Sequence, residues 1–285
     1  MTGLDEAALR GELTGGGSGT QGNRGQGKSR LWTSVTVVDS TGSTNADLVA
    51  AGGPEGQVLV AEEQTAGRGR LGRSWAGRPG ASLLFSVLVR PDSIPPGRRS
   101  WLPLLAGVAV ATAVRLDTGL PATLKWPNDL LIDGRKFTGI LAEQTASPEQ
   151  PGDAVVIGIG INVANQADEL PSGPGGLPPT SLLAEGADVS RQELLVEILR
   201  QFERHYLAFK ANPDPVATGL AAEYENLCAT LGRQVRVELP ASRTLTGEAT
   251  GIDSDGRLLV TSTRAGSITP GSVTPVSAGD VVHVR

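Results

Sequence analysis

The sequence of 285 residues contains one cysteine, Cys228, and two histidines, His205 and His283. A single cysteine excludes an internal disulfide framework and is typical of a protein kept in a reducing compartment. With so few Cys and His residues, zinc sites and Cys–His or Ser–His nucleophile pairs have almost no side chains to form from. Any catalytic chemistry must therefore come from Lys, Arg, Asp and backbone groups.

Other absences bear on location and on partners. No apolar run approaches the roughly 18 residues that span a bilayer. The opening segment, MTGLDEAALRGELTGGG, contains acidic residues and lacks the apolar core of a secretion signal. The net charge of -5 is unlike that of a protein whose main task is to grip nucleic acid. We expect a cytoplasmic protein with neither a membrane nor a nucleic acid as partner.

Changes in composition divide the chain into three parts. Residues 1–31 are rich in Gly, Ser and other polar residues, and bury too little apolar surface to become ordered, so we expect a disordered tail. Residues 32–230 contain the long apolar segments of a larger domain. Residues 231–285 consist of short alternating strands separated by Gly, Asp and Ser turns, which predict a small β-barrel of about 50 residues.

The larger domain mixes both kinds of secondary structure, so its expected fold class is α+β. Apolar runs of strand length predict strands at 35–39, 57–64, 82–90 and 154–163. Helices are predicted at 45–51, at 100–116 and from 191 to about 210, the last one begun by a capping box of Ser190 and Glu193. Residues 122–144 predict a strand, a turn, and a strand pair folded across Asp133-Gly134.

The segment AGRGRLGRSW, residues 66–75, contains the richest motif. Its glycines match the spacing G-x-G-x-x-G, but no amphipathic helix follows and no acidic residue stands about 20 positions on, so a dinucleotide site is rejected. Arg68, Arg70 and Arg73 alternate with glycine directly after a strand. The segment is either a solvated basic loop or an anion-binding loop, and the alternation with glycine favours anion binding.

A second cluster is Lys125-Trp126-Pro127-Asn128-Asp129, with Lys136 beyond the next turn. Two oxygen-bearing side chains at a fixed turn suit Mg²⁺ or ribose contacts, and two nearby lysines could neutralise a phosphoryl group. An Asx-type turn with two exposed lysines explains the same residues equally well. Both interpretations stay open on local grounds.

Two further segments carry polar side chains at the ends of apolar elements. Ser43-Thr44-Asn45 stands where a helix N-cap is expected, and its hydroxyls could also contact a small polar ligand. In GIGINV, residues 158–163, the isoleucines predict a buried strand. Asn162 closes that strand, and a buried amide must find hydrogen-bond partners.

Taken together and in order, these segments resemble the bacterial biotin protein ligases. The resemblance runs from about Val38 to Leu182, and more loosely to the end. It rests on the strings GSTN, EEQTAGRGRLGRSW, LKWPNDLLIDGRKFTGILAE, GIGINV and TSL. It implies a catalytic domain similar to the class II aminoacyl-tRNA synthetase fold, with a mixed sheet backed by helices, followed by an SH3-like barrel. Lipoate or octanoate protein ligases of the same superfamily are the nearest alternative.

The resemblance also implies roles for individual residues. The biotin-binding positions are Ser43, Thr44, Asn45, Gln64, Arg68, Gly69, Arg70 and Lys136. The nucleotide-binding positions are Arg68, Arg70, Trp75, Lys125, Asn128 and Asn162. Lys136, Arg70 and Asp129 are the expected catalytic residues. No dedicated metal site is expected, since Mg²⁺ would arrive with ATP, and Asp129 is the one side chain considered as its contact.

The reaction that the resemblance implies has two steps. Biotin and ATP first form biotinyl-5′-AMP, and a lysine of the biotin carboxyl carrier domain of an acyl-CoA or pyruvate carboxylase then takes the biotin. Neither step needs an enzyme nucleophile, in agreement with the scarcity of Cys and His. Many relatives begin with a DNA-binding domain of about 60 residues. Only a Gly-rich segment precedes the first strand here, so we expect a ligase without repressor function. The acceptor and the oligomeric state do not follow from the sequence.

Overall fold

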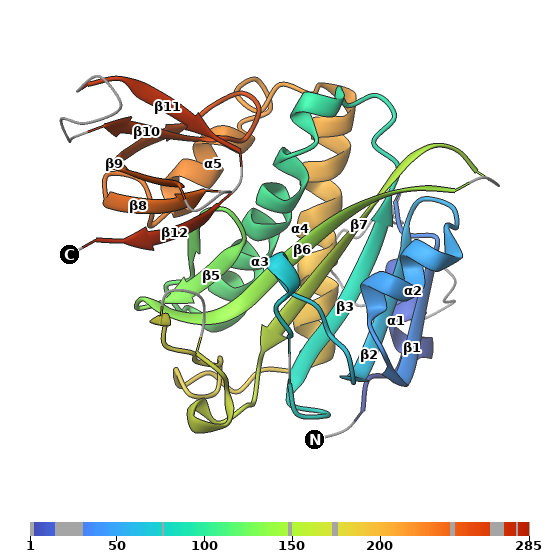
Figure 1. Ribbon diagram of the computed structural model, residues 1–285. Coiled ribbons are helices and arrows are strands. Elements are labelled where there is room, and N and C mark those ends of the chain that lie inside the picture. The colour runs from blue at the N-terminus through green and yellow to red at the C-terminus, as the bar shows by residue number, and fades with distance from the viewer. Residues whose placement is uncertain are drawn as a thin grey trace.

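A computed structural model describes residues 3–14, 31–75, 77–147, 150–172, 176–239, 243–262, 271–277 and 279–284. Most of the chain forms a mixed seven-stranded sheet with helices on both faces, and the C-terminal part forms a separate five-stranded sheet (Figure 1). This is the α+β arrangement, with a small all-β unit after it, that the sequence predicts.

The large sheet contains every strand predicted for this part of the chain. Its strands are β1 Ser34–Thr41, β2 Gln57–Gln64, β3 Ser82–Val89, β4 Thr123–Lys125, β5 Asp129–Ile132, β6 Arg135–Ser147 and β7 Gln150–Asn162. Their order is β1-β2-β3-β7-β6-β5-β4, with β1 and β2 parallel and the other pairs antiparallel. Asp133 (φ 47) and Gly134 (φ 77) form the tight turn between β5 and β6. The predicted Asp-Gly hairpin is confirmed, because a type I′ turn needs positive φ at both residues.

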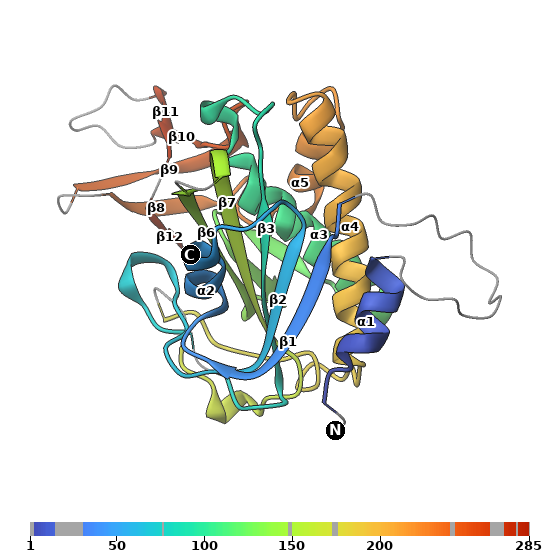
Figure 2. The ribbon, with the colours of Figure 1, turned by 90° about the vertical axis from the view of Figure 1, so that its right-hand side faces the viewer.

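Helices cover the two faces of this sheet unequally. The helices of this region are α2 Thr44–Ala51, α3 Trp101–Thr118, α4 Arg191–Ala211 and α5 Leu220–Leu227, and short 3₁₀ turns occur at Arg70–Gly72, Pro96–Arg98 and Ala167–Glu169. In the view of Figure 2, α2 lies on one side of the sheet, and α3 and α4 lie on the other. Ser190 caps α4 by accepting from Glu193 N at 3.3 Å, at the predicted start.

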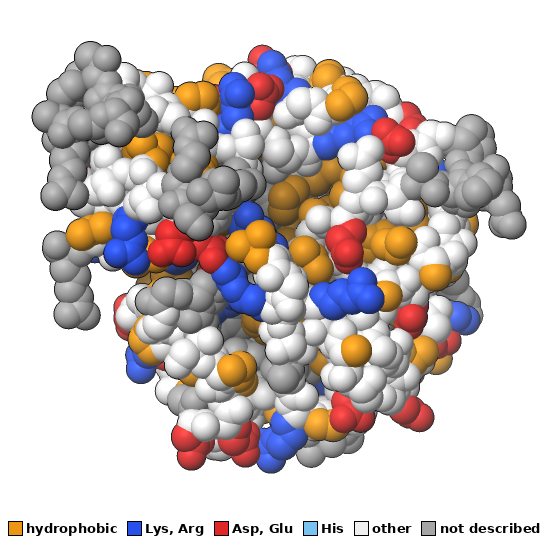
Figure 3. Space-filling model, viewed as in Figure 1, with side chains coloured by type: hydrophobic (Ala, Val, Ile, Leu, Met, Phe, Trp, Pro, Cys, Tyr) orange, Lys and Arg blue, Asp and Glu red, His pale blue; other side chains and the backbone are white. Residues whose placement is uncertain are grey.

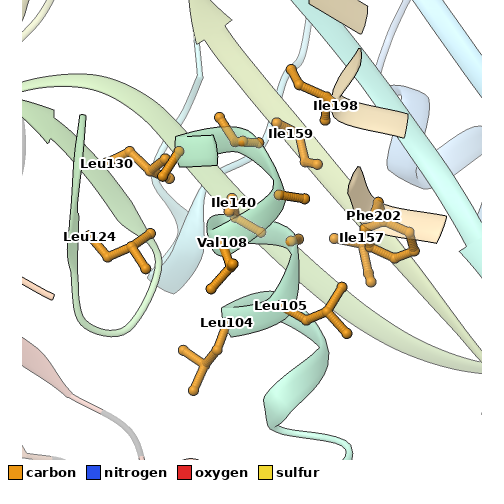
Figure 4. Packing of buried hydrophobic residues seen from close by; sticks show 14 of the residues in the cluster. Leu104, Leu105, Val108, Leu124, Leu130, Ile140, Ile157, Ile159, Ile198 and Phe202 are labelled. Carbon is orange, nitrogen blue, oxygen red and sulfur yellow. The ribbon is translucent and has the colours of Figure 1, made fainter. Parts of the chain in front are cut away.

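The most apolar helix is a core helix. By length and composition, Pro96–Thr118 could cross a membrane, which corrects the expectation that no run comes near that length. In the fold, most of this apolar stretch is buried. Leu104, Leu105 and Val108 of α3 pack beside the sheet residues Ile140 and Ile157 (Figure 4). The helix is apolar on nearly all sides because it is enclosed by the sheet and α4.

Strand alternation separates this core from the opposite face. In β7, Ile157, Ile159 and Ile161 belong to the large core, whereas Gly158 and Gly160 face the other way. A smaller cluster of Leu48, Leu59, Leu88, Ala154 and Val156 seats α2 on that second face. Beside the start of α2, Gly158 and Gly160 leave this face of the sheet without side chains of its own.

The C-terminal sheet is antiparallel and touches the large domain. Its strands are β8 Gln234–Leu239, β9 Arg243–Ile252, β10 Leu258–Ser262, β11 Val273–Val276 and β12 Asp280–His283, in the order β11-β10-β9-β8-β12. Trp101 Nε1 donates to Ser254 O at 3.0 Å, and Trp126 Nε1 donates to Gly256 O at 3.1 Å. Two buried indoles therefore fasten the small domain to the large one.

The expected disordered tail is wrong where the structure describes it. Glu6–Leu13 form helix α1, in which Leu9 (0% exposed) and Leu13 (2%) are buried. Glu6 Oε2 accepts from Val37 N at 2.7 Å, and Arg10 Nε donates to Val35 O at 2.8 Å. The composition did not indicate this helix, because a short helix is stabilised by packing and not by its own propensity. The rest of the predicted tail, 1–2 and 15–30, lies outside the described residues.

Candidate functional site

A cavity of ≈ 630 Å³ lies on the face of the sheet that α2 leaves uncovered. Its floor includes Gly139, Gly158 and Gly160 of β6 and β7, and the 66–75 loop forms one side. Figure 3 looks onto this face, where basic side chains lie near the centre, beside the C-terminal domain. The glycines of the floor allow other side chains to lie close against the sheet, because a Cβ on any of the three would collide with a neighbouring side chain.

Trp75 lies on the bare part of that floor. A Cβ placed on Gly139 would come 2.7 Å from Trp75 Cζ3, and one on Gly160 would come 2.4 Å from its Cε2. The two glycines are partners in the β6–β7 register. Trp75 Nε1 is buried and has no hydrogen-bond partner in the described structure. The indole thus needs both glycines, and it has a donor available for a ligand.

The 66–75 loop, called the arginine loop below for its Arg68, Arg70 and Arg73, is folded as a small hairpin. Gly69 N donates to Arg73 O at 2.7 Å, and Trp75 N donates to Gly67 O at 2.8 Å. The chain reverses at Leu71, which has φ 57 and is 71% exposed. The alternating pattern of Gly and Arg therefore produces a loop whose backbone is paired and whose Arg68, Arg70 and Arg73 line the cavity.

Arg70 reaches from this loop to the β4–β5 turn. Its Nη1 donates to Asn128 Oδ1 at 3.1 Å, and Asn128 Nδ2 donates to Ile140 O at 3.0 Å. Burial lowers the pKa of Arg70, while the carboxylates of Asp280 and Asp129 act in the opposite direction. Arginine remains charged at neutral pH in such surroundings, so a cation is held at the cavity wall.

Asp129 lies between two lysines. Lys136 Nζ is 2.5 Å from Asp129 Oδ1, and Lys125 Nζ is 3.7 Å from Oδ2. Burial lowers the pKa of Lys125, Asp129 raises it, and Lys136 lowers it further. Lys136 Nζ also lies 5.6 Å from the centre of the Trp75 ring. One carboxylate serves two cations, so the cluster carries excess positive charge that suits an anionic ligand.

The polar end of the cavity is built at the start of α2. Ser43 caps the helix by accepting from Ala46 N at 3.4 Å. Thr44 N donates to Gln64 Oε1 at 2.8 Å, and Thr44 Oγ1 is 2.6 Å from Ser86 Oγ. Asn45 fits against the floor because Gly158 has no side chain, since a Cβ there would come 2.2 Å from Asn45 Oδ1. The N-cap interpretation of this segment is confirmed, and its three polar residues line the cavity.

Asn162 ends β7 at the opposite end of the cavity. Its Nδ2 donates to Thr180 O at 3.0 Å, while its Oδ1 is buried without a partner in the described structure. The residue is 5% exposed. A buried amide oxygen with an unused acceptor is costly unless a ligand or water satisfies it.

The described residues do not offer a metal centre of their own. No group of three or more His, Cys, Asp or Glu side chains that could hold a metal ion occurs among them. Asp129, the one residue considered for Mg²⁺, already contacts two lysines. These side chains therefore do not fit a cation held by the protein itself.

Comparison with known proteins identifies the family. Residues 34–162 match the Biotin/lipoate A/B protein ligase family, and residues 230–284 match the Biotin protein ligase C terminal domain. The Biotin--[acetyl-CoA-carboxylase] ligase of Mycobacterium tuberculosis is 41% identical over 99% of this chain and 96% of its own length. The chain belongs to the biotin protein ligase family.

Other biotin protein ligases agree in sequence and in fold. The Bifunctional ligase/repressor BirA of Escherichia coli is 32% identical, with 80% of this chain and 69% of that protein matched. The Aquifex aeolicus biotin protein ligase, solved in complex with biotin and ATP, superimposes with a TM-score of 0.70 and 28% identity over 88% of this chain and 98% of its own. The expected fold class, with its small C-terminal domain, is therefore confirmed.

Against this family background, the structure gathers nearly all of the site residues expected from the sequence. Those that line the cavity are Ser43, Thr44, Asn45, Gln64, Arg68, Gly69, Arg70, Trp75, Asn128, Asp129, Lys136 and Asn162. Lys125 lies behind Asp129 and lines a small adjoining cavity of ≈ 40 Å³. Sequence reasoning missed Ser86, Glu143 and Asp280. Ser86 and Glu143 both contact Asn45, and Asp280 pairs with Arg73 of the 66–75 loop. For Ser86 alone there was a signal, a hydroxyl inside an apolar strand.

Proposed function

We propose that the cavity binds biotin and ATP, forms biotinyl-5′-AMP, and transfers the biotinyl group to a lysine of a biotin carboxyl carrier domain. One observation carries this proposal. Arg70 from the loop and Lys136 from β6 line a single cavity whose polar end is formed by the start of α2. A small acid and a nucleotide phosphate can share these two cations only when both ligands occupy that cavity together.

The polar start of α2 suits the head of biotin. Ser43, Thr44, Asn45 and Gln64 provide hydroxyl and amide groups at one end, and Gly158 leaves room for the ligand and for Asn45. Lys136 stands toward the other end, beside Trp75. In this arrangement the biotin carboxylate points toward Lys136, while Arg68, Gly69 and Arg70 close over the ligand.

Adenylation requires positioned charge and no enzyme nucleophile. A carboxylate oxygen of biotin attacks the α-phosphorus of ATP, the bond from that phosphorus to the pyrophosphate oxygen breaks, and pyrophosphate leaves with the electron pair. Lys136 and Arg70 offset the negative charge that gathers at the α-phosphate. Asp129 holds Lys136 Nζ at 2.5 Å and so fixes the direction of that charge. Trp75, Lys125, Asn128 and Asn162 are assigned to the nucleotide.

The second step uses the mixed anhydride as acyl donor. The ε-amine of the acceptor lysine attacks the biotinyl carbonyl carbon, the bond to the AMP oxygen breaks, and the amine proton goes to solvent. Carrier domains of acyl-CoA or pyruvate carboxylases are the proposed acceptors. The cytoplasm, where ATP is supplied, is the proposed location, and the buried free thiol of Cys228 suits a reducing compartment. Residues 32–230 are assigned to catalysis and 231–285 to the C-terminal domain.

ATP–pyrophosphate exchange tests the proposal directly. Labelled pyrophosphate should enter ATP when biotin is supplied, and exchange should fall to background when biotin is withheld. Lipoate and octanoate are the matched acids, because they share the carboxylate and lack the ureido ring. If lipoate or octanoate stimulates the exchange and biotin does not, the protein is a lipoate or octanoate ligase and the proposed function is wrong.

A further inference from the structure

Glu143 is a charged residue beside the site to which no role has been assigned. It lies on β6, two residues beyond Leu141, on the face that carries the cavity. Its Oε2 accepts from Asn45 Nδ2 at 2.7 Å. It also lines a second cavity of ≈ 580 Å³ on the outer side of the arginine loop. A carboxylate here is thus connected to the proposed biotin pocket through Asn45.

The contact with Glu143 fixes which way the Asn45 amide points. Asn45 Nδ2 faces two acceptors, Glu143 Oε2 at 2.7 Å and the Leu141 carbonyl at 3.2 Å. Rotating the amide would place its oxygen against both of them. Asn45 Oδ1 must therefore face Ser86 Oγ, which lies 2.6 Å away. The carboxylate makes Asn45 an acceptor toward Ser86, and never a donor.

Counting protons extends this orientation to Thr44. The hydroxyls of Thr44 and Ser86 hold two protons, but they take part in three contacts: Ser86 to Asn45 Oδ1 at 2.6 Å, Thr44 to Ser86 at 2.6 Å, and Thr44 to Gln64 Oε1 at 3.0 Å. Asn45 Oδ1 and Gln64 Oε1 can only accept. If the two shortest contacts hold the protons, Thr44 donates to Ser86 and Ser86 donates to Asn45.

This direction of donation sets what the cavity offers to a ligand. Thr44 Oγ1 donates its proton to Ser86, so it can offer only lone pairs to a ligand in the cavity. Gln64 Oε1 accepts from Thr44 N and keeps a second lone pair. Both groups then act as acceptors, and they favour a ligand that brings N–H donors. A ureido ring provides such donors, whereas the apolar chains of octanoate and lipoate do not.

We propose that Glu143 is a positioning residue of this enzyme: by holding Asn45, it orients a hydrogen-bond chain through Ser86 that turns Thr44 into an acceptor for the N–H groups of biotin. The inference rests on the proposed function, since it assumes that biotin occupies the polar end of the cavity. Glu143 acts through Asn45 and does not itself touch the ligand.

Glu143→Gln is the sharpest test, because it keeps the shape and removes the charge. Gln keeps one oxygen that can accept from Asn45 Nδ2, but the hydrogen bond loses its charge and becomes weaker. The Asn45 amide is then held less firmly in the orientation that makes it an acceptor toward Ser86. Loss of hydrogen bonds of this kind should raise the KM for biotin in pyrophosphate exchange on the order of 10-fold. The KM for ATP and kcat at saturating biotin should stay within about twofold. Gln144→Ala, an exposed neighbour on the same strand, is the matched control and should change neither constant.

Ser86→Ala interrupts the same chain at a second point and leaves Glu143 in place. It removes one oxygen from a fully buried side chain, and it should raise the KM for biotin in the same direction. If one of the two variants has a much lower melting temperature than the unaltered protein, the KM for biotin of the other variant still tests the proposal. An unchanged KM for biotin in both, or a parallel loss of kcat and of both KM values, overturns the proposal.

The second cavity provides a competing role that the same assay separates. If Glu143 instead received the acceptor lysine, Glu143→Gln would leave pyrophosphate exchange intact and impair only transfer to the carrier domain, which would also overturn the proposal. Failure of the proposed function itself would differ from both, because the unaltered protein would then show no biotin-dependent exchange.

Discussion

Arg73 of the arginine loop forms an ion pair with Asp280, the first residue of β12 in the C-terminal sheet. The two residues are separated by 207 positions in the chain, and the pair joins the loop that covers the cavity to the other domain. Because the two side chains are 38% and 23% exposed, solvent screens the pair and its contribution should be about 0.5–1 kcal/mol.

We therefore expect Asp280→Asn to weaken closure of the loop without abolishing adenylation. Biotinyl-5′-AMP formed in a single turnover without carrier should escape about two to five times faster, as the screened pair energy implies. Release is measured by rapid filtration. The exchanged pair Arg73→Asp with Asp280→Arg should restore much of the retention. A variant that holds the intermediate as long as the unaltered enzyme would argue against a role for this pair.

Lys136 is expected to act in the adenylation step. Lys136→Ala should reduce biotin-dependent pyrophosphate exchange on the order of 10²–10³-fold, because a preorganised cation is removed from the α-phosphate. Arg135→Ala is the control, since Arg135 pairs with Glu185 at 2.5 Å and does not line the main cavity. Near-normal exchange by Lys136→Ala would remove the basis of the assignment.

Gly160 and Trp75 should behave as a coupled pair. A Cβ on Gly160 would come 2.4 Å from Trp75 Nε1, so Gly160→Ala should expel the indole from the floor and lower the affinity for ATP. In a Trp75→Ala background, the same glycine substitution should cost far less, because the new methyl group meets no ring. Isothermal titration of all four proteins gives the coupling energy. Strictly additive effects would show that the two residues act separately.

The C-terminal domain should make stability depend on pH near neutrality. Burial, together with the charges of Lys125 and Arg233, lowers the pKa of His283 to about 4. The unfolded chain, with a His pKa of about 6.5, binds the proton first. Stability is thus fully present above pH 6.5 and is lost progressively as the pH falls toward 4.

His283→Asn should flatten that part of the pH profile. The measurement is urea denaturation between about pH 4 and 7.5, taking the difference between the two proteins so that other titrating groups, among them His205, largely cancel. Asn keeps a polar group near Thr230 Oγ1, which lies 3.1 Å from His283 Nε2. Identical slopes for both proteins would contradict the assignment.

Much of the site could be predicted because its residues fall in a few short segments, each with a recognisable pattern of its own. The isoleucines of GIGINV indicated a buried strand, and Ile159 and Ile161 do lie in the large core. The Gly-Arg loop and the Lys-Trp-Pro-Asn-Asp turn contributed recognisable side chains. Which of these side chains come together depends on the order of the strands in the sheet, where β6 lies between β7 and β5.

The residues that were missed depend on contacts between distant segments. Glu143 gains its importance from Asn45, 98 positions away, and Asp280 gains its importance from a loop in the other domain. Leu9 and Leu13 occur in a short helix that depends on its packing and on its hydrogen bonds to β1. No local pattern records such relationships, because the partner lies in a different part of the sequence.

Helix α1 has a practical consequence for handling the protein. β1 is the outermost strand of the large sheet, and Glu6 and Arg10 occupy the backbone groups of Val37 and Val35 that a neighbouring strand would otherwise bind. A fragment that begins near Trp32 would expose those backbone groups, together with the apolar surface that Leu9 and Leu13 cover. Such a fragment is expected to aggregate. Residues 1–31, including helix α1, should therefore be kept in any protein prepared for crystals or assays.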